Sequence, residues 1–72
     1  MKIFIQQTTG GRYWSHQVGW VQTRGAATVF GRIVAAIDAF ISDRLVTADV
    51  LMTFGAPRYD ARLRMGPLFV SA

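Results

Sequence analysis

The 72-residue chain has no cysteine, no glutamate, one histidine and two prolines. Without cysteine it has no disulfide, no thiolate nucleophile and no cysteine-rich zinc site. His16 follows Ser15 directly, but neighbours on a strand point to opposite faces, so the pair is not placed as base and nucleophile. The four aspartates are scattered along the chain. We therefore expect no catalytic residue, no metal site, no cofactor and no enzymatic activity.

Long hydrophobic runs are also missing. The most apolar segment, residues 29–41, is interrupted by Arg32 and Asp38, and a membrane span needs roughly 18 uninterrupted apolar residues. The composition is 51% hydrophobic and 17% charged, which is typical of a globular chain rather than a disordered one. We expect one domain over residues 1–72, cytoplasmic and without membrane contact.

The net charge of +4 comes from Lys2 and seven arginines against four aspartates. This sign excludes a protein that imitates nucleic acid with an acidic surface. Arginine suits planar recognition of carboxylate or phosphate, although it also serves as an ordinary solvated surface residue.

The first half of the chain has strand patterns. Residues 2–7 alternate around Ile3 and Ile5, and residues 8–11 form a turn cluster. Residues 13–21 predict one second strand, with Gly19 at a bulge. Its period places four residues on one side: Trp14, His16, Val18 and Trp20. Residues 26–30 fit a short third strand or the first turn of a helix, and their β-branched residues favour the strand.

A helix is predicted over residues 32–44. Five apolar residues fall on one face at 100° per residue: Ile33, Val34, Ile37, Phe40 and Ile41. Away from them lie Ala35, Ala36 and Ala39, which serve either as good helix formers or as a surface that another backbone can approach closely. A homodimer through this alanine face, or through a sheet edge, is therefore one expectation.

Residues 47–65 fit two structures. As strands, residues 49–65 form a hairpin that turns at residues 55–57, and residues 58–65 alternate strictly. As helices, Thr47 is an N-cap, Gly55 ends the first helix and Pro57 opens a second with Arg58 and Arg62 one turn apart. We favour the strands. Residues 68–70 add a further apolar segment that fits an edge strand.

These elements predict an α+β fold: a small antiparallel sheet, made of an N-terminal and a C-terminal hairpin, with one helix packed on one face. The apolar helix face would meet six sheet residues: Ile3, Ile5, Trp20, Val50, Met52 and Phe54. Such a core is small, so a partner that covers exposed surface would add stability.

Four residues form the candidate contact surface: Arg58, Tyr59, Arg62 and Arg64. Arginine and tyrosine dominate interface hot spots, and guanidinium groups pair with carboxylates. The leading hypothesis is a non-enzymatic module that binds a protein partner. The alternative is a DNA or RNA binder that uses the same arginines with aromatic stacking. Asp60 would partly neutralise the arginine row, and Trp14 and Trp20 are favoured as core residues.

Two resemblances accompany this pattern. The first covers Tyr13-Trp14, Gly19-Trp20, residues 26–30, a helix containing Ala36, Asp49-Val50-Leu51 and residues 54–60. It resembles small uncharacterised bacterial and phage proteins, and it implies a β-rich first half, one helix, a returning strand and no activity. On it rests the idea of a phage or mobile-element accessory protein that inhibits a host or defence protein.

The second covers Phe54-Gly55, Arg58 and Ala61-Arg62-Leu63, with Thr47 at the capping position. It is similar to the second and third helices of phage-type helix-turn-helix proteins. This resemblance implies that Arg58 and Arg62 lie on a recognition helix in the major groove.

Overall fold

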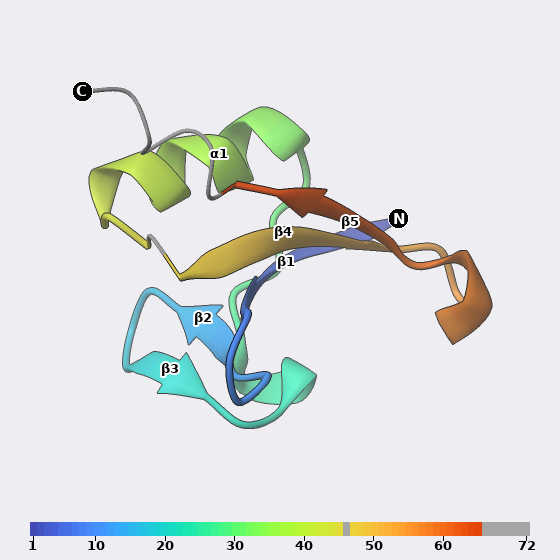
Figure 1. The fold of residues 1–72 in the computed structure, drawn as a ribbon, viewed down its shortest axis with the longest axis horizontal. Coiled ribbons are helices and arrows are strands. Elements are labelled where there is room, and N and C mark those ends of the chain that lie inside the picture. The colour runs from blue at the N-terminus through green and yellow to red at the C-terminus, as the bar shows by residue number, and fades with distance from the viewer. Residues whose placement is uncertain (46, 66–72) are drawn as a thin grey trace.

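In a computed structural model, which describes residues 1–45 and 47–65, one antiparallel sheet carries one helix (Figure 1). The strand order is β3-β2-β1-β4-β5. The elements are β1 (Lys2–Gln7), β2 (Tyr13–Ser15), β3 (Gly19–Val21), η1 (Arg24–Ala26), α1 (Ile33–Ser42), β4 (Ala48–Thr53), η2 (Pro57–Tyr59) and β5 (Ala61–Arg64). This arrangement confirms the predicted α+β class.

The central pair of strands, β1 and β4, forms the platform of the fold. They pair in register from Lys2 opposite Thr53 to Gln7 opposite Ala48. Ile5 and Val50 lie opposite each other and are both fully buried. Apolar residues occupy both faces of these strands: Ile3, Ile5 and Val50 belong to the core under α1, and Phe4 and Leu51 are buried on the other face.

The segment predicted as one second strand is a hairpin. Residues 16–18 form a turn between β2 and β3, and Gly19 leaves it with a φ of 87°. Such an angle suits glycine, so Gly19 can close the turn as the first residue of β3. Trp14 lies opposite Trp20, as the shared face predicted, with ring centroids 5.3 Å apart. His16 and Val18, predicted on that face, are exposed in the turn.

The favoured third strand at residues 26–30 is reduced to one bridge. The chain makes the 3₁₀ turn η1, and then Phe30 donates its backbone N–H to the Ile3 carbonyl at 2.8 Å. β2 pairs with the far end of β1, at Gln6. The two segments therefore share the side of β1 that faces away from β4.

The C-terminal segment is extended, which confirms the strand prediction for residues 47–65. β4 and β5 are joined through η2. Helix-turn-helix geometry is excluded because the first proposed helix is the strand β4, and the second is the single 3₁₀ turn η2 followed by the strand β5. The strict alternation predicted from Arg58 starts later, at Ala61, because Arg58 and Tyr59 belong to η2. The predicted strand at residues 68–70 lies outside the described residues.

The buried face of α1 differs from the predicted one. Ala36 and Phe40 are fully buried and Ala39 is buried, whereas Val34 and Ile41 are more than half exposed. Small alanines let the helix backbone approach β1 and β4 closely. A dimer contact through Ala36 and Ala39 is therefore wrong, because the sheet of the same chain covers them.

The core lies between α1 and the sheet. It consists of Ile3, Ile5, Phe30, Ala36, Ala39, Phe40, Leu45, Ala48, Val50 and Met65. Trp14, Trp20, Ile37 and Met52 pack against it while remaining partly exposed. Phe54, predicted in the core, is 50% exposed because it follows the end of β4. Within the described part of the chain, no helix has the length and apolar character needed to cross a bilayer.

Candidate functional site

Two of the four candidate residues lie on the sheet face opposite α1. Arg62 of β5 is opposite Leu51, and Arg64 is opposite Asp49. Between them Leu63 is opposite Val50, a core residue on the helix side. Because successive side chains alternate in a strand, Arg62 and Arg64 share the face away from the helix.

Arg62 is held by two partners on neighbouring strands. Its Nη1 lies 3.4 Å from Asp49 Oδ2, and its Nη2 donates to Gln6 Oε1. The Asp49 side chain is only 9% exposed, and its Oδ1 accepts the backbone N–H of Met65 at 3.3 Å. Arg62 therefore compensates a nearly buried carboxylate, which gives it a structural role as well as a candidate contact role.

Arg64 has a different environment. It is exposed, and no carboxylate of the described residues pairs with it. Together with Arg62, Gln6, Gln7, Thr8, Gly11 and Asp49 it lines an open depression of about 620 Å³. Its guanidinium is therefore exposed on the sheet face, next to the Asp49 carboxylate that pairs with Arg62.

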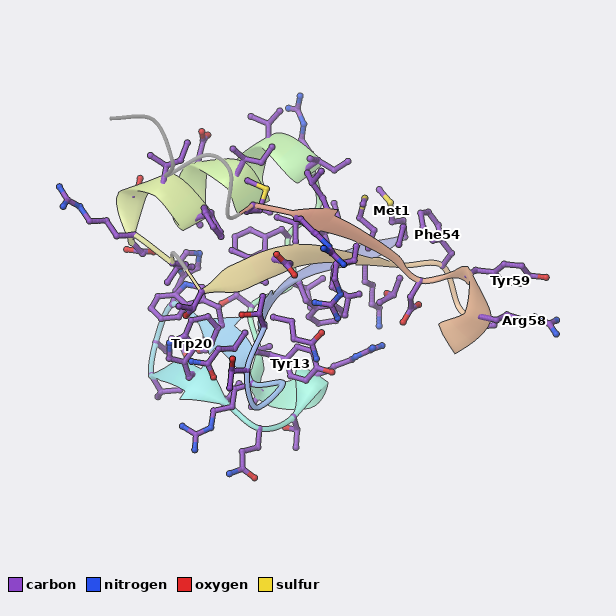
Figure 2. All side chains as sticks on the ribbon, viewed as in Figure 1. Met1, Tyr13, Trp20, Phe54, Arg58 and Tyr59 are labelled. Carbon is purple, nitrogen blue, oxygen red and sulfur yellow. The ribbon has the colours of Figure 1, made fainter. Side chains whose placement is uncertain are left out.

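Arg58 and Tyr59 lie at the tip formed by η2. The Arg58 guanidinium carbon is 5.0 Å from the centroid of the Tyr59 ring, a cation–π distance, and Tyr59 is 57% exposed. Figure 2 shows both side chains extending outward from the tip. We call the four residues Arg58, Tyr59, Arg62 and Arg64 the arginine edge, because they belong to η2 and to the edge strand β5.

Arg24 is not among the residues that the sequence pattern singles out, yet it makes several contacts in the fold. Its Nε donates to Tyr13 Oη at 3.2 Å, and its Nη2 lies 3.3 Å from Asp60 Oδ2. Its guanidinium carbon is 5.6 Å from the ring centroids of both Phe4 and Tyr13. Arg24 thus joins η1, β1, β2 and the start of β5 across the open face.

Asp60 pairs with Arg24, so it does not neutralise the arginine edge as predicted; Asp49 does so at Arg62. Which carboxylate meets which arginine depends on strand register, and the single sequence carries no signal for it. The pKa of the Arg24 guanidinium is raised, first by the hydrogen bond to Tyr13 and then by Asp60, against an opposing effect of burial.

The residues considered for catalysis are placed apart. Ser15 is buried, and its Oγ accepts the backbone N–H of Gln17 at 3.3 Å. His16 is exposed, with its ring centroid 5.5 Å from that of Phe30 in an edge-on contact. Within residues 1–45 and 47–65, no three His, Cys, Asp or Glu side chains lie close enough to hold a metal ion.

Apolar side chains are exposed beside the arginine edge. Leu63, between the two arginines of β5, is 39% exposed. On α1 the outward residues Ile33, Val34 and Ile41 are also exposed. Past the C-terminal end of β4, Phe54 lines a second open depression of about 710 Å³ together with Met1 (Figure 2). The two faces of β5 therefore differ: Arg62 and Arg64 lie on one, and the apolar Leu63 lies on the other.

Comparison with known proteins adds no assignment: no protein-family model, curated protein or solved structure matches the chain.

Proposed function

We propose that the protein is a non-enzymatic binding module that recognises an acidic surface of a protein partner through the arginine edge. One observation carries the proposal: Arg58, Tyr59 and Arg64 are exposed along η2 and β5, and neither arginine has a carboxylate partner among the described residues. Arginine and tyrosine are enriched at interface hot spots, where they supply planar contact area and directed donors.

The neighbouring apolar surface supports a protein partner over a nucleic acid. Leu63 lies beside the arginines and is 39% exposed. An interface with a protein combines such apolar contacts with charge pairs, whereas a phosphate backbone offers mainly charge. The sheet face itself presents few free aromatic rings, because Trp14 and Trp20 pack on the core and Tyr13 is held by Arg24.

Selection from a displayed library of random peptides tests the proposal. The immobilised full chain is expected to enrich peptides rich in aspartate and glutamate. The double variant R58E/R64E is expected to lose their binding without a change in thermal midpoint, because neither side chain supports the fold. Enrichment without acidic residues, or none, would overturn the proposal.

A nucleic-acid binder that uses the basic sheet surface is the rival function, favoured by the exposed Tyr59 next to Arg58. Fluorescently labelled duplex and single-stranded oligonucleotides distinguish the two. Binding of oligonucleotides without selection of acidic peptides assigns the arginine edge to nucleic acid.

A further inference from the structure

We infer that the partner supplies an extended segment that pairs with the free edge of β5, with carboxylates opposite Arg62 and Arg64 and apolar side chains on the side of Leu63. This inference rests on the proposed function and specifies the conformation and residue pattern of what is bound.

Among residues 1–45 and 47–65, no strand pairs with β5 on the side away from β4. β5 ends the strand order, and its four residues pair only with β4 among the described residues. An edge strand presents unpaired N–H and C=O groups that can bind another strand. The neighbouring strand β4 holds β5 in place, because β4 is itself paired along its whole length with β1.

The two faces of β5 set the residue pattern of the added strand. Arg62 and Arg64 point to the open face, and Leu63 points to the helix side, where α1 lies over β1 and β4 and leaves Leu63 39% exposed. Residues directly opposite on paired strands share a face. The bound segment therefore alternates acidic and apolar residues.

Charge also disfavours a second copy of the chain as the source of the strand that pairs with β5. In the antiparallel registers that pair most of β5 with β5 of a second copy, the arginine faces meet and Arg62 lies opposite Arg62 or Arg64 of that copy. Like charges directly opposite are destabilising. The same arginines attract a strand that carries carboxylates, through charge-assisted hydrogen bonds.

Two synthetic peptides of identical composition separate strand pairing from simple charge attraction. One alternates glutamate with valine, and the other repeats two glutamates followed by two valines, which puts glutamate on both faces of a strand. We expect the alternating peptide to bind the ¹⁵N-labelled full chain about tenfold more tightly. Amides of residues 61–64 should gain protection from hydrogen exchange in that complex.

A charge-matched pair of variants locates the contact. R64E is expected to weaken binding of the alternating peptide at least about tenfold. R12E makes the same change in net charge at an exposed arginine between β1 and β2 and should leave the affinity within about threefold. Thermal midpoints of both variants show whether the fold is kept.

The outcomes distinguish this inference from the proposed function. Equal binding of the two peptides, or protection outside β5, overturns strand pairing and leaves recognition of acidic partners in place. Failure of both peptides while library-selected acidic peptides bind also overturns it. Failure of the library selection itself removes the proposed function.

Discussion

At the scale of single residues, the arginines of β5 carry equal formal charge but have unequal roles. Arg62 faces a carboxylate that is 9% exposed and a glutamine on β1, whereas Arg64 faces solvent. Removing the Arg62 guanidinium leaves the nearly buried Asp49 carboxylate without its partner, while the 40% exposure of the Arg62 side chain lets solvent screen part of the loss. Charge reversal at both positions would therefore mix a folding defect with a binding defect.

Stability measurements on R62A and R64A separate these roles. R62A should lower the free energy of unfolding by about 1–2 kcal/mol, because Asp49 loses its guanidinium. R64A should change it by less than about 0.5 kcal/mol, as is usual for an exposed side chain without partners. Urea denaturation measures both, and equal losses would mean that the Asp49 contact stabilises nothing.

Arg24 depends on the shape of its guanidinium as well as its charge. It donates to Tyr13, pairs with Asp60 and lies 5.6 Å from two ring centroids. Lysine keeps the charge but not the planar group, so R24K should cost about 0.5–1 kcal/mol. The same exchange at exposed Arg12 should stay within about 0.5 kcal/mol. Thermal unfolding compares the two variants, and identical midpoints would mean that only the charge of Arg24 contributes to stability.

The pKa of Arg24 is raised in the folded state, so its charge and its contribution to stability are present throughout neutral pH. The contribution is lost only as the pH rises above the ordinary arginine range.

At the scale of elements, the sequence predicted the first strand, the helix and the C-terminal hairpin, but it took β2 and β3 for one strand, favoured a strand at residues 26–30 that is only a bridge, and missed the orientation of the helix. Periodicity identifies an apolar stripe and assumes that the largest side chains face inward. Here the approach distance between α1 and the sheet selects alanine, so Ala36 is buried and Val34 is outside. The start of β5 was likewise predicted too early in the chain, at Arg58 instead of Ala61, because the first residue of a hairpin strand depends on where its turn ends. The pairing of Arg62 with Asp49 depends on register, a relation between distant residues that local pattern does not contain.

Two alanine substitutions on α1 test this orientation. A36L inserts a bulky side chain where the exposed fraction is 0%, and overpacking of this kind should cost about 1–3 kcal/mol. A35L, on the exposed side, should change the free energy of unfolding by less than about 0.5 kcal/mol. Chemical denaturation measures both variants. Equally small changes in both variants would restore the helix face that periodicity predicted, because that face left both alanines outside.

At the scale of the whole molecule, two ion pairs within the fold neutralise part of the positive charge. Asp60 pairs with Arg24 and Asp49 with Arg62. Within the part of the chain that the structure describes, the arginine edge therefore keeps two guanidiniums without a carboxylate, those of Arg58 and Arg64. Two phosphate contacts give a slope of log K against log salt near 2, which is roughly a tenfold loss of affinity for a duplex between 50 and 200 mM salt. A dedicated binder with six to ten contacts loses about 10³–10⁵-fold over the same range.

We therefore expect weak duplex binding with a shallow salt dependence, measured by fluorescence anisotropy on a labelled duplex of random sequence. R64E should flatten the dependence further, because it removes one of the two free guanidiniums, whereas A35L, which keeps the charge, should leave it unchanged. A single-stranded oligonucleotide in parallel reports any stacking on Tyr59. Tight binding at 50 mM salt with a steep loss by 200 mM would mean that positive charge elsewhere on the surface joins the arginine edge, and nucleic acid would then replace the acidic protein as the partner.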